Sequence, residues 1–153
     1  MSLHASSIHG RTARGFTLIE TMIAVSIAGV LSSIAYPSFT GQLQRARRTD
    51  AMVTLMQAQL AQERFRSGNA GYGSLAEIGV RDRSLSGHYA VEVRGNAAET
   101  YEIVASASGA QAGDTTCRTI RLSQVSGTGL VFASGPDASA SNPTDINRKC
   151  WNR

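Results

Sequence analysis

The chain has 153 residues, 42% of them hydrophobic and 17% charged, with a formal net charge of +4. This length fits about one domain, and the composition is that of a folded protein. Two of the positive charges, Arg11 and Arg14, lie in the acid-free segment 1–15, so residues 16–153 carry 13 basic against 11 acidic side chains. A balance so close to neutral gives little reason to expect nucleic acid as the main partner.

Residues 1–15 have the features of a short basic leader. Their sequence, MSLHASSIHGRTARG, is polar and is followed at once by an apolar run. In a secretory signal peptide, the small residue at the cleavage site follows the apolar region. Here the small residue, Gly15, precedes it. Cleavage after Gly15 would therefore leave the apolar segment attached to the mature chain.

Residues 16–36 form the apolar run FTLIETMIAVSIAGVLSSIAY. A helix needs ~20 residues to cross a bilayer, so this run is long enough. Serine and threonine are tolerated in lipid because they can bond to their own helix, and small residues allow helices to pack closely. The run could therefore lie first in a lipid bilayer and later in a bundle of identical helices. Arg11 and Arg14 would keep its N-terminal end in the cytoplasm.

Glu20 is a carboxylate near the start of this apolar segment. An acid in a membrane span is costly and is usually functional. After cleavage behind Gly15, the new amino group of Phe16 would lie one helical turn from Glu20. The carboxylate could pair with its own amine or with that of a neighbouring subunit, and the second pairing would set the register of assembly. The alternative is an acid that only extends to the surface where the helix dipole favours it.

Pro37 follows the apolar run directly. Because proline removes a backbone hydrogen bond and crowds the preceding turn, we expect a kink rather than an end of the helix. A helical pattern continues over 37–67 and stops near Gly68. We expect this amphipathic half to lie on a sheet. Its apolar positions are Met52, Leu55, Met56 and Leu60; polar side chains on other faces are Gln59, Gln62, Glu63 and Arg64.

Residues 68–153 are expected to form a globular head. Four segments have the alternation and residue types of strands, at 88–94, 101–105, 117–123 and 129–133. The connection 69–87 has room for a short helical piece near 75–78, and 134–148 is expected to be loop. One long helix followed by four antiparallel strands is an α+β arrangement.

The chain has two cysteines, Cys117 and Cys150, which form no CxxC motif. An even cysteine count in a chain with export features favours a disulfide, and the alternative is two buried free thiols. The crosslink would close the C-terminal loop and stabilise the fold by ~3–4 kcal/mol in the chain-entropy model.

The sequence offers no catalytic, cofactor or metal site. Of the three histidines, only His88 lies outside the leader, and no serine or cysteine nucleophile stands in a recognisable motif. The glycine-rich stretches lack a phosphate-loop pattern. Asp137 and Asp145 alone are too few acids for a hard cation. We therefore do not expect an enzyme.

The sequence GFTLIE at 15–20 resembles the processing motif of type IV pilins and of the pseudopilins of type II secretion. The basic leader, the apolar helix and Pro37 belong to the same resemblance. Further along, the head is similar to minor pilins of the PilE-like group. The segments that carry this second likeness are ARRTDA at 46–51, QERF at 62–65, HYAVEV at 88–93 and GDTTC at 113–117.

The resemblance implies the type IV pilin fold, with the long helix packed on a four-stranded antiparallel sheet and a disulfide-closed C-terminal loop. It also implies a prepilin peptidase that cuts after Gly15 and methylates Phe16, and a role for Glu20 in assembly. The expected divisions are a leader at 1–15, a transmembrane or filament-core helix at 16–36, its amphipathic continuation at 37–67 and the head at 68–153.

We therefore expect a structural subunit, in particular a minor pilin, that supports pilus biogenesis, twitching motility, adhesion or DNA uptake. It would cross the bacterial inner membrane once and then join a pilus on the cell surface. Its partners would be other pilin subunits, the peptidase, an inner-membrane assembly platform and lipid.

Three alternatives stay open: a type II secretion pseudopilin, a DNA-receptor pilin and an anchored protein that never polymerises. The candidate residues for nucleic-acid or lipid contact are Arg45, Arg47, Arg48, Arg148 and Lys149.

Overall fold

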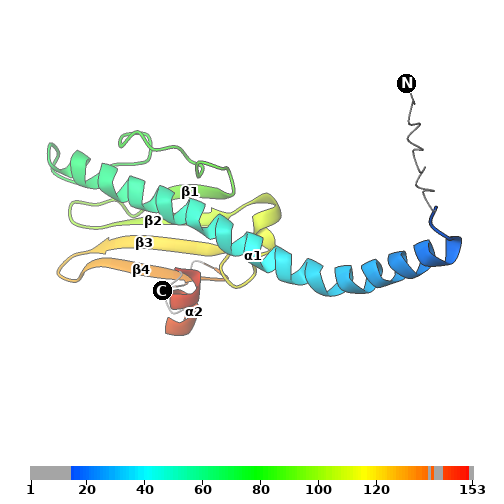
Figure 1. Ribbon diagram of the computed structural model, residues 1–153. Coiled ribbons are helices and arrows are strands. Elements are labelled where there is room, and N and C mark those ends of the chain that lie inside the picture. The colour runs from blue at the N-terminus through cyan, green and yellow to red at the C-terminus, as the bar shows by residue number, and fades with distance from the viewer. Residues whose placement is uncertain (1–14, 138, 140–142, 152–153) are drawn as a thin grey trace, which may run out of the picture. The chain divides into compact units, whose positions relative to one another are not determined.

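The computed structural model describes residues 15–137, 139 and 143–151. Residues 1–14, the bulk of the expected leader, lie outside the described residues. In chain order the elements are α1 (Leu18–Arg66), β1 (Tyr89–Arg94), β2 (Tyr101–Ala107), the 3₁₀ helix η1 (Gly109–Gly113), β3 (Thr119–Val125), β4 (Gly129–Gly135) and α2 (Thr144–Cys150) (Figure 1). The chain divides into two compact units, 1–38 and 39–153.

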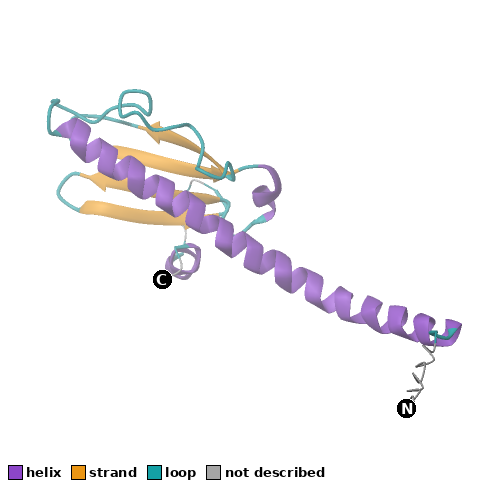
Figure 2. Ribbon diagram, turned by 45° about the horizontal axis from the view of Figure 1, so that its top comes forward, coloured by secondary structure: helices purple, strands orange, loops and turns teal. Residues whose placement is uncertain are grey.

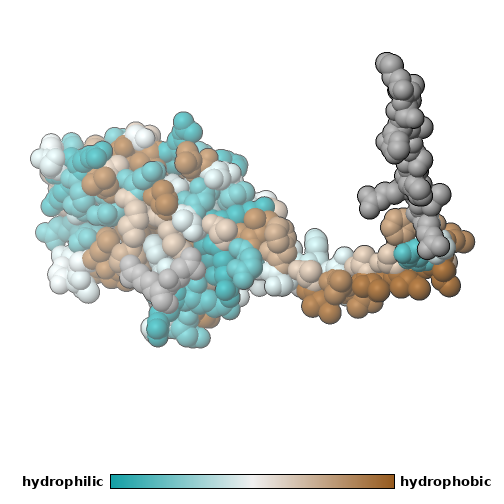
Figure 3. All heavy atoms as spheres, in the orientation of Figure 1, coloured by the Kyte–Doolittle hydropathy of each residue, from teal (hydrophilic) through white to brown (hydrophobic). Residues whose placement is uncertain are grey.

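The described part of the first unit is helical from Leu18 onward and exposes its large apolar side chains (Figure 3). Leu18 is 81% exposed and Ile34 is 70% exposed. Helix α1 is long and apolar enough to cross a membrane, by length and composition. Its hydroxyl groups bond to their own helix, as expected: Ser26 donates to the carbonyl of Met22 at 2.8 Å and Ser32 to that of Ala28 at 2.7 Å.

Helix α1 continues through Pro37 instead of ending there, as the sequence predicted. The predicted kink at this residue stays a prediction. The helix ends at Arg66, two residues before Gly68.

Within the second unit, α1 crosses one face of the sheet (Figure 2). The sequence was right about Leu55, which is fully buried, but wrong about neighbouring positions. Leu60 is 50% exposed, whereas Gln62, expected on another face, is completely buried. Alanines at 51 and 58 form the rest of the contact stripe, because their small side chains let the helix approach the sheet closely.

The buried Gln62 is stabilised by a reciprocal pair of hydrogen bonds. Its side-chain amide donates to the carbonyl of Gly73 at 2.7 Å, and its carbonyl accepts from the Gly73 backbone N–H at 2.9 Å. A buried polar group that is fully hydrogen-bonded carries no unpaired desolvation cost. The spacing of apolar and polar residues along α1 could not reveal this partner, because Gly73 lies in the loop that follows the helix.

The four strands form an antiparallel meander in the order β1-β2-β3-β4, as predicted. Strand β1 alternates, with Tyr89 and Val91 buried and Ala90 and Glu92 exposed. Ile103 of β2 pairs with Leu122 of β3, and both are buried beneath α1. Strands β2, β3 and β4 each end two residues later than expected, because ladder pairing continues past the apolar positions.

Three local expectations about the head require correction. Helix α2 (Thr144–Cys150) begins within the segment 134–148 that was expected to be loop, and the 3₁₀ helix η1 was not foreseen. Residues 75–79 form a turn rather than a helix. Helix α2 is too short for a readable apolar period, and its place is fixed by distant contacts. Its Asn147 donates to the carbonyl of Phe132 in β4 at 2.7 Å.

Candidate assembly site

The first turn of α1 is closed by a capping box. The Glu20 backbone N–H donates to the Thr17 hydroxyl oxygen at 3.3 Å, and the Thr17 backbone N–H donates to a Glu20 carboxylate oxygen at 3.5 Å. This reciprocal arrangement satisfies two N–H groups that would otherwise lack partners at a helix start. The T-x-x-E spacing that produces it was visible in the sequence, but only Glu20 was singled out there.

The cap fixes where the helix begins relative to the expected cleavage site. Gly15, Phe16 and Thr17 are not helical, and α1 starts at Leu18. Phe16 is 82% exposed. The bond between Gly15 and Phe16 therefore lies in non-helical backbone one residue before the capping threonine, with the Glu20 carboxylate at the same end of the helix.

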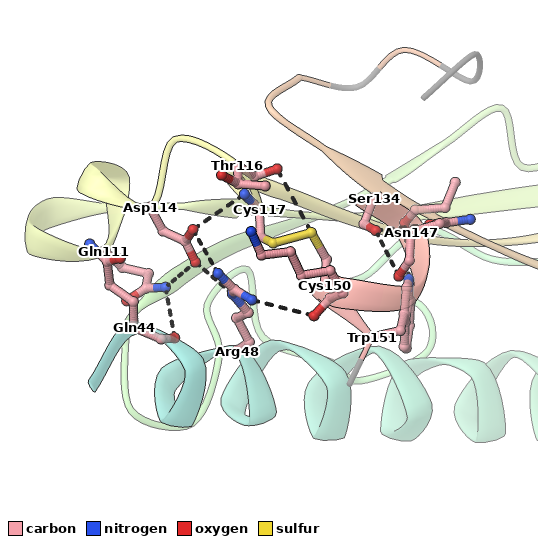
Figure 4. Close-up of a disulfide and its surroundings, with 12 residues drawn as sticks. Gln44, Arg48, Gln111, Asp114, Thr116, Cys117, Ser134, Asn147, Cys150 and Trp151 are labelled. Atoms are coloured by element: carbon pink, nitrogen blue, oxygen red, sulfur yellow. Dashed lines mark hydrogen bonds and ion pairs between the residues drawn. A yellow bond between two sulfur atoms is a disulfide. The ribbon is translucent and has the colours of Figure 1, made fainter. Parts of the chain in front are cut away.

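The predicted disulfide is confirmed. Cys117 and Cys150 are bonded, with their Cα atoms 5.5 Å apart and a sequence separation of 33 residues (Figure 4). The bond ties the last residue of α2 to the segment just before β3. Both cysteines are fully buried. The crosslink thus holds the C-terminal segment on the sheet, where Trp151 packs edge-on against Phe132 with 4.9 Å between ring centroids.

Arg48 lies at the centre of a buried polar cluster (Figure 4). Its guanidinium donates to both carboxylate oxygens of Asp114, at 2.7 and 2.9 Å, and to the carbonyl of Lys149 at 3.4 Å. The two charged side chains are 5% and 3% exposed. The expectation that Arg48 contacts nucleic acid or lipid is therefore wrong, because its guanidinium is enclosed and already bonded.

Gln111 of η1 extends this cluster toward the sheet. Its amide nitrogen lies 3.2 Å from Asp114 and 3.1 Å from the hydroxyl of Tyr89. Burial raises the pKa of Tyr89 to about 12, so the phenol is neutral at physiological pH. The sequence did not reveal the partners of Arg48, Asp114 and the Lys149 carbonyl, because they lie 66 and 101 residues further along the chain.

The other predicted contact residues stay at the surface. Arg45, Arg148 and Lys149 are exposed, and Arg47 is half-buried. The bond from Arg48 to the Lys149 carbonyl brings the end of α2 against α1 near residue 48.

No group of three or more His, Cys, Asp or Glu side chains that could hold a metal ion occurs in the described part of the chain. A groove of about 500 Å³ on the sheet contains Arg94 and Arg121. Both are paired with acids, Arg94 with Glu92 and Arg121 with Glu102. The groove is therefore not a free cationic site.

An exposed apolar helix with a capped carboxylate in its first turn, joined to a disulfide-closed α+β head, defines the pilin-like class of filament subunits. The comparisons with known proteins agree with this class. A family model described as the type IV minor pilin ComP, DNA uptake sequence receptor, matches residues 37–121. A second model, the prokaryotic N-terminal methylation motif, matches residues 10–36.

Three curated relatives illustrate the range of similarity. The type IV major pilin protein PilA of Myxococcus xanthus is 43% identical over 67 residues, 43% of this chain and 30% of that protein. The type II secretion system core protein G of Pectobacterium carotovorum is 34% identical over 65 residues, 42% of each chain. The type IV wide pilus major component PilA4 of Thermus thermophilus is 30% identical over 101 residues, 65% of this chain and 77% of that protein.

The chain spans less than half the length of the first two relatives and about three quarters of the third. It belongs to the type IV pilin family. It is a pilin subunit, and the family is one of structural proteins. The methylation motif and the apolar helix are those of a pilin that is anchored in a membrane before it joins a surface pilus.

Proposed function

We propose that this chain is a minor subunit of a type IV pilus, made as a precursor that is cut after Gly15 and methylated on Phe16. The observation that carries the proposal is the start of α1. There a non-helical Gly15–Phe16 bond precedes a capped helix whose large apolar side chains are exposed. A peptidase needs an accessible extended bond, and cutting here leaves the whole apolar helix on the mature subunit.

Glu20 acts in assembly under this proposal. In the precursor its carboxylate accepts from its own backbone at Thr17. Cleavage creates an ammonium group on Phe16, and a carboxylate in an apolar environment is stabilised strongly by a cation. Pairing with the ammonium of a neighbouring subunit would neutralise both charges in the filament core and fix the register between helices.

The same proposal sets the location and the other partners. The basic leader would hold the N-terminus in the cytoplasm while the head is exported. There the disulfide between Cys117 and Cys150 can form. A prepilin peptidase and an inner-membrane assembly platform would handle the anchored subunit, and lipid would surround its helix until assembly.

A pilus subunit is favoured over a secretion pseudopilin by the part of the chain that matches. The minor-pilin family model covers 37–121, which includes β1, β2 and the start of β3. The similarity to the secretion core protein G extends over 65 residues. Likeness within the head is the better guide to the filament type, because the match at 10–36 is to a general prokaryotic methylation motif.

Gene deletion distinguishes the two systems. Loss of the chain should reduce surface pili and twitching while leaving protein secretion at its normal level. Reintroducing the wild-type gene should restore both the pili and the twitching. Normal piliation together with a secretion defect would contradict the pilus assignment. Sheared filaments from the complemented strain should contain the chain at a low ratio to the most abundant pilin, as expected for a minor subunit.

DNA binding is a second candidate function. It rests on the description of the matching family as a DNA uptake sequence receptor and on the exposed cations Arg45, Arg148 and Lys149. Binding through these groups would weaken as salt rises, because each neutralised phosphate releases counterions. Purified protein in detergent should bind duplex DNA at low salt, and Arg148→Glu with Lys149→Glu should abolish it. No binding by the wild type at low salt would rule this function out.

A further inference from the structure

The stretch of α1 that follows the apolar run combines cations with exposed apolar side chains. Residues 37–49 contain three arginines and no acidic residue, and no acid occurs anywhere between Glu20 and Asp50. Phe39 is 66% exposed and Leu43 is 38% exposed, so the core of the head does not explain these two side chains. Exposed phenylalanine and leucine beside arginines are typical of a helical segment that meets a membrane surface.

Two of the three arginines keep an unneutralised charge. Arg48 is enclosed and bonded to Asp114. Arg45 is exposed and Arg47 is half-buried, and neither forms an ion pair with any described residue. A helix turns ~100° per residue, so these two side chains leave α1 ~200° apart, on nearly opposite sides. Their charges can therefore reach anions on both sides of the helix.

The acids on neighbouring elements leave these two charges free. The two carboxylate oxygens of Asp50 accept hydrogen bonds from the loop before β1, at 2.6 and 3.0 Å. Both carboxylate oxygens of Asp114 accept from Arg48. Asp145 in the first turn of α2 forms no ion pair with a described residue, and the last turn of that helix carries two cations. The local balance of charge around 45–47 therefore stays positive.

The chain places this stretch directly beyond the segment that is long enough to cross a membrane. The apolar run ends at Tyr36, and Phe39 follows three residues later, which is at most ~11 Å of chain. The polar headgroup region on each side of a bilayer is ~5–8 Å thick. Along the helix, Arg45 and Arg47 lie ~9 and ~12 Å beyond Phe39. A long arginine side chain can carry its charge back toward the phosphates while its stem covers apolar surface.

We propose that these residues form a collar, defined as Phe39, Leu43, Arg45 and Arg47, that binds anionic phospholipid at the membrane face from which the head emerges. Phe39 and Leu43 would lie in the headgroup region. Arg45 and Arg47 would bind lipid phosphates on either side of the helix. The inference rests on the proposed function, since it concerns the anchored subunit before assembly. Binding here would hold the head against the bilayer and set how deeply the apolar run is inserted.

Two observations favour lipid over nucleic acid as the source of the phosphate. The collar is continuous in the chain with the apolar run that the membrane holds. The phosphate backbone of duplex DNA, moreover, offers no apolar partner for Phe39 and Leu43, whereas the headgroup boundary of a bilayer does. A lipid surface therefore accounts for both the apolar and the cationic members of the collar.

Lipid retention by the full chain measures the binding. The protein is reconstituted in nanodiscs that contain equal amounts of phosphatidylglycerol and phosphatidylcholine, and native mass spectrometry in detergent counts the lipids that stay bound. The wild type should retain mainly phosphatidylglycerol. Arg45→Gln with Arg47→Gln should lower the ratio of phosphatidylglycerol to phosphatidylcholine roughly fivefold or more, because one arginine near an anionic surface contributes about that factor.

The matched control is Arg81→Gln with Arg83→Gln, which removes the same charge from an exposed loop of the head and should keep the wild-type ratio. Equal retention of the two lipids by the wild type would overturn the proposal, as would an unchanged ratio in the collar variant or an equal fall in the control. Displacement of the lipid by excess inorganic phosphate would overturn it in favour of a free-phosphate site. Loss of duplex DNA binding in the collar variant, with a normal lipid ratio, would assign the arginines to nucleic acid.

Spin labels test the apolar members of the collar. Both native cysteines are joined in the disulfide, so an introduced cysteine can be labelled selectively. In phosphatidylglycerol vesicles, a label at Phe39→Cys should be shielded from a water-soluble nickel complex. A label at Leu85→Cys, where the native side chain is 80% exposed on the head, should be fully accessible to it. Equal access at the two positions would overturn the apolar contact, and an intact disulfide in each variant would show that the head is folded.

Failure of this inference can be distinguished from failure of the proposed function. The lipid measurements concern the subunit before assembly, whereas the proposed function is read from filaments. A chain that enters filaments but shows no preference for phosphatidylglycerol would overturn the collar alone. A chain that is absent from filaments but loses phosphatidylglycerol only in the collar variant would contradict the pilus assignment and support the collar.

Discussion

In residues 15–38 the polar groups bond within their own helix and the large apolar side chains are exposed, whereas residues 39–151 contain a buried hydrophobic core and polar groups that bond across the fold. Ser26 and Ser32 bond to carbonyls four residues away, while Arg48 reaches Asp114 across 66 residues. The first unit is locally complete and lacks a hydrophobic partner. The head contains its own hydrophobic core. This contrast separates a helical segment whose described large apolar side chains are all exposed from a head with its own hydrophobic core.

The largest expected effect comes from removing the charge at the start of the exposed helix. Glu20→Gln keeps an acceptor at the third helical position, so the capping box survives. Incorporation into filaments should nevertheless fall by roughly tenfold or more, because the pairing with the Phe16 ammonium is lost. Quantitative immunoblots of sheared filaments measure this. Cleavage of the leader should be unchanged, and normal incorporation would refute the pairing.

In the head, the largest effect should come from breaking the buried ion pair. Arg48→Met leaves Asp114 charged and enclosed, and removal of one partner of a buried pair costs ~3–5 kcal/mol of folding stability. Thermal unfolding of the full chain in detergent would detect it. The double variant Arg48→Met with Asp114→Leu should recover part of the loss. A single variant as stable as the wild type would show that the pair contributes nothing.

These two residues also show what the sequence could and could not reveal. Glu20 was recognisable because its meaning depends on neighbours three and four positions away. Arg48 was misassigned to a surface cluster because its partners, Asp114 and the Lys149 carbonyl, are distant in sequence. The same reasoning explains Gln62, whose partner Gly73 lies in a loop. The strands were predictable from alternation, whereas α2 is too short to carry a pattern.

A smaller effect is expected at Thr17, whose hydroxyl group caps α1. Thr17→Val keeps the shape but removes the acceptor for the Glu20 N–H, at a cost of ~0.5–2 kcal/mol in capping energy. The helix start should become less sharply defined, and processing in a pulse-chase experiment should slow. Thr17→Ser retains the hydroxyl and should be cut at the normal rate. Equal rates for the two variants would contradict a role for the cap.

The smallest effect concerns pH and is confined to the head. Burial raises the pKa of Tyr89 to about 12 and raises the pKa of Tyr101 as well, above the ordinary value near 10. The folded state therefore holds these protons more tightly than the unfolded state. Stability should be complete below pH ~10 and fall as pH rises from ~10 toward 12.

Tyr101→Phe is the matched control for this alkaline loss. The Tyr101 hydroxyl is buried without a hydrogen-bond partner among the described residues, so phenylalanine removes the titration and leaves no donor unpaired. The variant should lose less stability between pH 10 and 12 in circular-dichroism melts. A loss identical to that of the wild type would show that Tyr101 does not contribute.

Mass spectrometry of the chain recovered from sheared filaments tests the central claim most directly. The account predicts a mature protein that begins at Phe16, carries one added methyl group on its amino terminus and retains the Cys117–Cys150 bond. A chain in filaments that still carries residues 1–15, or that begins beyond the apolar helix, would contradict it.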